Sequence, residues 1–98
     1  MKARKLVGTV AAVAALVLLP VAGAAADTVQ VGGGLWSYGV TLDSVYSNYH
    51  HPSRYHTATA CNNGWVDQCR QAAASAGAWA NATSARSIYG NTAYWNTY

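Results

Sequence analysis

Apolar and polar residues alternate along several short stretches of the chain, which is the pattern of half-buried β-strands. The stretches with strand character are 29–31, 35–40, 45–50, 54–60 and 94–98. Within one of them, the alternation places Tyr46, Asn48 and His50 on a single face. Short strands separated by turn signals predict an all-β fold, either a small antiparallel sandwich or a barrel.

Proline and glycine residues mark the breaks between these strands. Pro52-Ser53 predicts a turn, because proline fixes φ and donates no main-chain hydrogen bond, so we expect residues 50–54 to form a hairpin bend. The Asn-Asn-Gly sequence at 62–64 is a further turn signal. The triple glycine at 32–34 lacks the residues that follow a phosphate-binding loop, and we expect a flexible junction or a bulge there.

The segment 71–85 supports two interpretations. Its eight alanines favour a helix by intrinsic propensity. Gly77 interrupts that run, and the alternation of Trp79, Asn81 and Thr83 is typical of a strand. Composition therefore leaves helix and strand equally open for this segment.

The first 26 residues have the organisation of a secretory signal peptide. The segment has three cationic residues among its first five, continues with an apolar run over 6–19, and ends in the small residues 24–26. We expect cleavage between Ala26 and Asp27, which leaves a secreted, extracellular domain of residues 27–98 with no membrane span. A single membrane anchor is the alternative, but the apolar run is short and no cationic stop-transfer segment follows it.

The net charge differs between the expected signal peptide and the rest of the chain. Six Lys or Arg residues against three acids give a formal charge of +3, and three of those cations lie within the first five residues. Residues 27–98 hold three arginines and three aspartates, so their formal charge is zero. This neutrality argues against a nucleic-acid partner. It also argues against a pore-forming peptide, which needs a basic amphipathic helix to collect on anionic membranes.

Cys61 and Cys69 are the two cysteines of the chain. In a small exported domain, we expect them to form a disulfide that closes a loop of nine residues. A zinc site is the alternative, but the C-x7-C spacing lacks the paired cysteines of zinc knuckles.

The histidines His50, His51 and His56 are the most reactive-looking feature of the sequence. Adjacent residues of a strand point to opposite faces, so these rings are poorly placed to converge on a metal, and we expect no metal and no other cofactor. The chain has no glutamate, and only Asp43 and Asp67 lie away from the expected new N-terminus. Because acid–base hydrolysis of sugars needs paired carboxylates, a small hydrolase is the least favoured class, and we expect no enzymatic activity.

One segment carries a more specific signal. Residues 44–59 read Ser-Val-Tyr-Ser-Asn-Tyr-His-His-Pro-Ser-Arg-Tyr-His-Thr-Ala-Thr and closely resemble the central motif of the lactococcin 972 family of bacteriocins. The Gly-rich opening at 32–40, the Ala-Gly-Ala-Trp-Ala segment at 76–80 and the aromatic tail at 94–98 follow in the expected order. The two cysteines and the loop between 60 and 76 depart from the family's pattern.

The resemblance implies a β-sandwich of two short antiparallel sheets, which favours a strand from about 78 to 85. It also implies a secreted antibacterial protein that binds the cell-wall precursor lipid II, or another envelope target, and blocks septum formation without forming pores. A non-toxic secreted envelope-binding protein of the same fold is the alternative. Exposed strand edges suggest a homodimer. The residues expected to bind the target are Tyr46, Asn48, Tyr49, His50, His51, Arg54 and His56.

Overall fold

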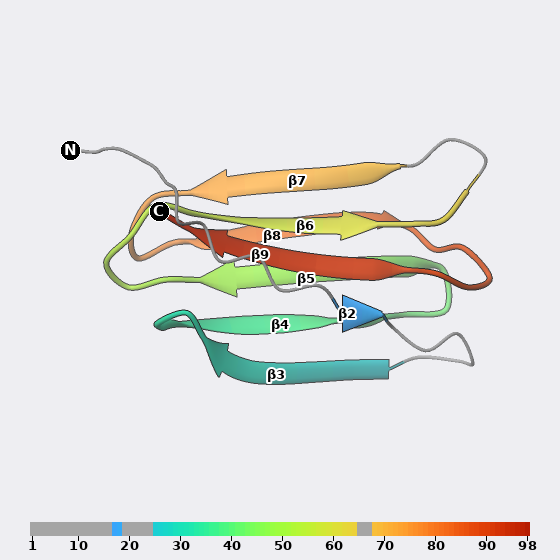
Figure 1. The fold of residues 1–98 in the computed structure, drawn as a ribbon, viewed down its shortest axis with the longest axis horizontal. Coiled ribbons are helices and arrows are strands. Elements are labelled where there is room, and N and C mark those ends of the chain that lie inside the picture. The colour runs from blue at the N-terminus through green and yellow to red at the C-terminus, as the bar shows by residue number, and fades with distance from the viewer. Residues whose placement is uncertain (1–16, 19–24, 65–67) are drawn as a thin grey trace.

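The computed structural model describes residues 17–18, 25–64 and 68–98, so most of the expected signal peptide lies outside the described residues. Every regular element of this described part is a β-strand (Figure 1). The strands are β2 (Val17–Leu18), β3 (Ala25–Val31), β4 (Gly34–Val40), β5 (Ser44–His50), β6 (His56–Cys61), β7 (Cys69–Ala74), β8 (Trp79–Ala85) and β9 (Thr92–Thr97). Among the described residues, no helix is long and apolar enough to cross a membrane.

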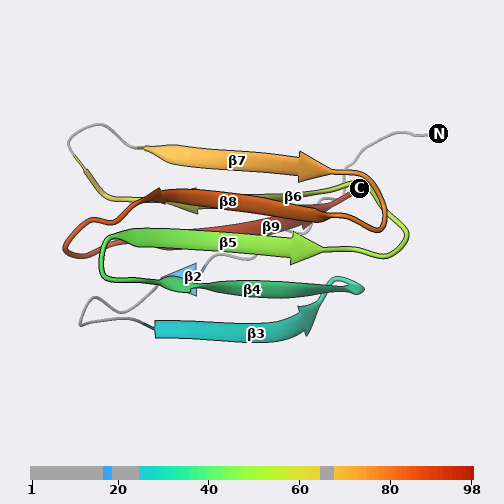
Figure 2. The ribbon, with the colours of Figure 1, turned by 180° about the vertical axis from the view of Figure 1, so that it is seen from behind.

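The strands form two four-stranded antiparallel sheets, with orders β2-β9-β6-β7 and β3-β4-β5-β8. Figures 1 and 2 show the two layers from opposite sides. Trp36, Tyr49 and Trp95 supply the large buried rings between the layers. Facing sheets lie only about 10 Å apart, so large rings fit where their neighbours are small. Those small buried neighbours are Ala58, Ala60, Ala80, Ala82 and Ala93. The predicted all-β sandwich is confirmed.

The hairpin predicted around Pro52 is wrong. Strand β5 pairs with β4 and β8, whereas β6 pairs with β7 and β9, so residues 51–55 carry the chain from one sheet to the other. A proline turn signals a change of direction but does not determine which strand lies alongside. Here β6 crosses to the opposite layer, where His56, Ala58 and Ala60 are buried.

The triple glycine is a tight turn, and the expected flexible junction or bulge is not found. Val31 pairs directly with Gly34 across the β3–β4 hairpin. Gly32 and Gly33 between them have φ values of +62° and +85°, the left-handed conformation that two-residue hairpin turns of type I′ require. At Gly34, an added Cβ would overlap the main-chain oxygen of His50. Glycine is therefore required here both for backbone conformation and for close packing.

The alanine-rich segment forms two strands, β7 and β8, joined by a turn at Gly77, which has a φ of +87°. Burial alternates along β8, with Ala80, Ala82 and Ser84 facing inward. Short side chains at these positions leave room for the large rings of the core, and this packing outweighs the helical propensity of alanine. The strand interpretation that the family resemblance favoured for residues 78–85 is confirmed, and the helical alternative is wrong.

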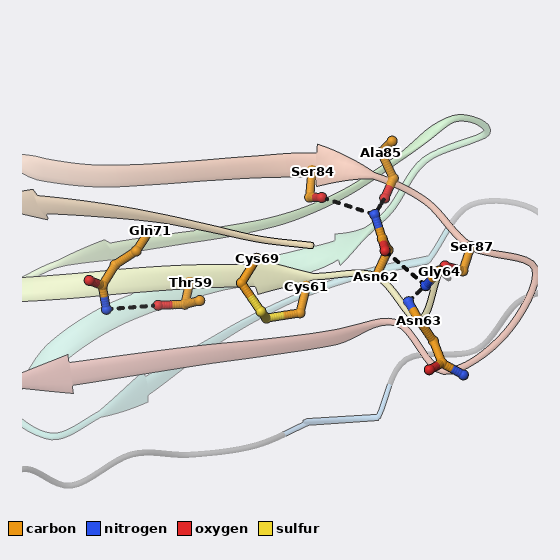
Figure 3. The surroundings of a disulfide bond; sticks show 10 residues. All are labelled: Thr59, Cys61, Asn62, Asn63, Gly64, Cys69, Gln71, Ser84, Ala85 and Ser87. Atoms are coloured by element: carbon orange, nitrogen blue, oxygen red, sulfur yellow. Dashed lines mark hydrogen bonds between the residues drawn. A yellow bond between two sulfur atoms is a disulfide. The ribbon is translucent and has the colours of Figure 1, made fainter. Parts of the chain in front are cut away.

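Cys61 and Cys69 form the predicted disulfide (Figure 3). They are directly opposite each other at the end of the β6–β7 pair, with their Cα atoms 4.1 Å apart. Next to the bridge, the main-chain N–H of Asn62 donates to the oxygen of Gln68, and the Asn62 side-chain amide donates to the main-chain oxygen of Ala85. The disulfide and Asn62 together attach this end of β6 to both β7 and β8.

Replacing both cysteines, Cys61→Ser with Cys69→Ser, should lower the free energy of unfolding by roughly 2–3 kcal/mol, because the nine-residue loop is no longer closed in the unfolded chain. Urea denaturation measures this loss. A reductant should destabilise the unmodified protein by a similar amount and leave the double variant unchanged. Equal stability of the oxidised protein and the double variant would contradict the prediction.

Candidate binding face and buried histidines

Strand β5 divides the motif of residues 44–59 into inward and outward side chains. Ser47 and Tyr49 are fully buried, whereas Tyr46, Asn48 and His50 alternate with them and are half-buried on the outer surface of the sheet. Because successive residues of a strand point to opposite faces, the motif cannot act as one contiguous site. Its two halves have different surroundings and different roles.

Tyr49 belongs to the inward half and is part of the core. Its ring packs against Trp95 with the ring centres 5.1 Å apart, and meets the His56 ring edge-on at 5.6 Å. Its hydroxyl donates to the main-chain oxygen of Val31 at 2.8 Å. Burial raises the pKa of the Tyr49 hydroxyl, so the group remains a neutral donor. Tyr49 thus joins the glycine turn to the second sheet.

His51 is buried where the glycine turn meets the 51–55 crossover. Its Nδ1 atom accepts hydrogen bonds from the main-chain N–H groups of Ser53 and Arg54, at 3.1 and 3.0 Å. The proton of the neutral ring is therefore on Nε2, which donates to the main-chain oxygen of Gly32 at 3.1 Å. Burial lowers the pKa of His51, which favours this neutral form.

His56 is also fully buried and connects a third loop. Its Nδ1 lies 2.7 Å from the main-chain oxygen of Arg54, and its Nε2 lies 2.8 Å from that of Ala78. The oxygen of His51 in turn accepts from the main-chain N–H of Gly77 at 2.8 Å. A neutral His56 ring has one N–H and donates to one of these two oxygens. Together with the Gly77–His51 bond, it attaches the crossover to the β7–β8 turn. The ring nitrogens of His51 and His56 face main-chain groups of the loops, and both side chains are almost completely buried, so they present almost no surface to a target.

Arg54 is exposed on the crossover. Its guanidinium Nη1 donates to the main-chain oxygen of Tyr98 at 3.1 Å, and the ring of the next residue, Tyr55, lies 5.7 Å from the Tyr98 ring. Arg54 is therefore a surface cation at the same end of the sandwich as the histidines, separate from the row of Tyr46, Asn48 and His50.

The outward half of the motif continues onto strand β8. His50 is opposite Trp79, Asn48 is opposite Asn81, and Tyr46 is opposite Thr83. Directly opposed residues share a face, so these six side chains form one surface, which we call the β5–β8 face. The rings of His50 and Trp79 are 5.3 Å apart, and Trp79 is 44% exposed. The six residues combine aromatic rings with amide and hydroxyl groups, and none is an acid or a Lys or Arg.

A hollow of about 430 Å³ adjoins the His50 end of this face. It is lined by residues 30–35 together with His50 and Pro52. The turn at 32–34 contributes no side chains, which leaves the space open. A face with aromatic rings, amides and a neighbouring hollow of this size can hold a ligand that carries both rings and hydrogen-bonding groups.

The sequence-based site omitted Trp79, Asn81 and Thr83, which complete the β5–β8 face. Their alternation was visible in the sequence and placed all three on one side of a strand. The alanines around them leave helix and strand equally open by composition, and the strand that the family resemblance favours does not by itself indicate its neighbour in the sheet. The pairing of their strand, β8, with β5 is visible only in the three-dimensional structure.

Lowering the pH should destabilise the protein through His51. Burial, together with the nearby His56, Arg54 and His50, lowers the pKa of this ring, so the unfolded chain binds the proton more readily than the folded one. The contribution of His51 is therefore complete above the ordinary histidine pKa of about 6.5 and declines as the pH falls below that value. Urea denaturation across this range should show a loss that is smaller in His51→Gln. An identical pH dependence in both proteins would refute the assignment.

The bacteriocin family model Lactococcin 972 matches residues 32–95 of this chain. The solved structure of lactococcin 972 is similar to it, with 38% sequence identity and a TM-score of 0.58, over 66% of this chain and 98% of that one. No curated protein gives a significant match. The family match includes the β5–β8 face and both buried histidines, and it confirms the resemblance noted for the motif. The chain belongs to the lactococcin 972 family of bacteriocins.

Proposed function

We propose that this chain is a secreted antibacterial protein that binds lipid II, or a similar cell-wall precursor, through the β5–β8 face and so blocks septum formation. The observation that carries the proposal is the continuous face of aromatic and amide side chains, with its adjoining hollow, on a member of a bacteriocin family. The protein acts by binding and has no enzymatic activity.

The chemistry of the face suits the parts of such a precursor. The rings of His50 and Trp79 offer surfaces on which sugar rings can stack, and the amides of Asn48 and Asn81 can bond to hydroxyl or acetamido groups. His50, in the face, and Arg54, exposed on the crossover at the same end of the sandwich, can donate hydrogen bonds to a pyrophosphate. The zero formal charge of residues 27–98 favours recognition of a specific target over bulk disruption of the membrane.

Removal of the signal peptide after Ala26 would change one sheet edge. Cleavage there starts the secreted chain within β3 and removes β2, which pairs with the β9 residues Thr92 and Ala93. Strand β9 then has a free edge of six residues without a charge or a proline, the features that usually protect an edge. We propose that β9 of a second copy pairs with this edge to form a homodimer.

Native mass spectrometry of the protein from an exporting host should therefore show a dimer of chains that begin at Asp27. Thr92→Lys adds a charge to the edge of β9 and should give monomers with the same N-terminus. Chains that retain residues 1–26 would rule out the cleavage. A monomer at all concentrations for the unmodified protein would rule out the dimer.

His50→Ala and Trp79→Ala should each weaken binding to lipid II in supported bilayers by about tenfold or more, because each removes an aromatic ring from the end of the face that adjoins the hollow. Inhibition of sensitive bacteria should fall in parallel, without leakage of the membrane. Tyr89→Ala is the matched control, because this tyrosine is 67% exposed and lies outside the face.

The growth assay and the binding assay separate the two functions. No binding of the unmodified protein to lipid II would remove the mechanism. Envelope binding without growth inhibition would identify the alternative, a non-toxic envelope-binding protein.

A further inference from the structure

The outer surface of the other sheet carries a second recess. A groove of about 330 Å³ follows strand β6, away from the β5–β8 face, and we call it the β6 groove. Its lining includes Thr57, Thr59, Gln71, Tyr94, Asn96 and the Cys61–Cys69 disulfide. We propose that the β6 groove binds an uncharged linear oligosaccharide.

The groove arises from differences in side-chain length between neighbouring strands. The threonines Thr57 and Thr59 lie on the central strand β6. Thr59 has larger residues opposite it on both flanking strands, and Thr57 has Asn96 opposite it on β9. Tyr94 on β9 and Gln71 on β7 both flank Thr59. Thr57, on the outward surface of the sheet, is only 6% exposed. The floor is made of hydroxyl groups and the disulfide, and the walls are made of amides and an aromatic ring.

The polar groups of the walls are held in position. The side-chain amide of Gln71 donates to the hydroxyl of Thr59 at 3.2 Å (Figure 3). The amide of Asn96 donates to the hydroxyl of Tyr98 at 3.3 Å. Each amide has a second N–H hydrogen with which it can donate to a ligand. Groups fixed in this way lose little conformational entropy when a ligand binds.

The groove discriminates between classes of linear ligand. A peptide strand needs free main-chain partners, but β6 is hydrogen-bonded to β7 on one side and β9 on the other, so the floor offers none. A phosphate-bearing chain needs cations, and the described lining contains no Lys, Arg or His. Sugar hydroxyls both donate and accept, which matches a lining of hydroxyls and amides.

Aromatic rings extend the groove along the strand. Beyond Asn96, Tyr55 and Tyr98 form an exposed pair, 53% and 55% accessible, with ring centres 5.7 Å apart. From Cys61 back to Tyr55 the strand direction covers about 20 Å, a length that several linked sugar rings would span. The Tyr94 ring midway and the tyrosine pair at the end supply stacking surfaces for such a chain. This site is independent of the proposed lipid II face.

Titration of the ¹⁵N-labelled protein with the neutral tetrasaccharide of N-acetylglucosamine tests the proposal by NMR. Amide shifts should concentrate at Thr57, Thr59, Gln71 and Asn96. Tyr94→Ala and Gln71→Ala should each weaken the affinity by about tenfold, and added salt should leave it unchanged. Thermal melting verifies that each variant is folded. If Tyr94→Ala is unstable, Gln71→Ala provides the test, because Gln71 is exposed on the edge strand β7.

Tyr89→Ala, which lies outside both the β6 groove and the β5–β8 face, is the matched control and should leave tetrasaccharide binding unchanged. No shifts at millimolar tetrasaccharide would overturn the proposal, as would shifts confined to β5 and β8 or a strong dependence on salt. Loss of tetrasaccharide binding in Tyr94→Ala with unchanged lipid II binding would support two separate sites.

Discussion

The hydrogen bonds of two buried histidines determine the geometry of one end of this sandwich. His51 accepts from two main-chain N–H groups of the crossover and donates to the glycine turn. His56 lies against carbonyl oxygens of the crossover and of the β7–β8 turn. A buried main-chain group without a hydrogen-bond partner costs about 1–3 kcal/mol. The two rings stabilise three loops because they serve as partners for main-chain groups of those loops. The position of His50 and of the hollow beside it follows from that arrangement.

Alternate residues of strand β5 point to opposite faces of its sheet, so the motif of residues 44–59 supplies both core residues and surface residues. Inward side chains such as Tyr49 hold the two sheets together, and outward ones such as Asn48 and His50 form a surface with strand β8. The second sheet adds a disulfide at the far end of β6 and a groove of neutral side chains along it. A small domain with zero formal charge between residues 27 and 98 thus offers two uncharged surfaces on opposite sheets.

Sequence alone supported the all-β class, most of the strands, the disulfide and the family. Alternation identified β5 and β9, because the strand period is short and each face has one environment. The turn signal at Pro52 predicted the wrong neighbour, because a turn does not reveal that β6 joins the opposite sheet. Composition left residues 71–85 undecided, because alanine fits a helix and a strand equally until its packing is known. The partition of the three histidines into one surface ring and two buried rings needed the crossover geometry.

In the proposed complex His50 contacts the target, whereas His51 and His56 hold the loops of the framework in place. The most direct test records the ring ¹⁵N resonances of the three histidines by NMR during titration with a water-soluble lipid II analogue. With this assignment of roles, the His50 resonances should shift and those of His51 and His56 should remain in place. Shifts of the two buried rings with His50 unmoved, or no shift of any ring at saturating analogue, would contradict it.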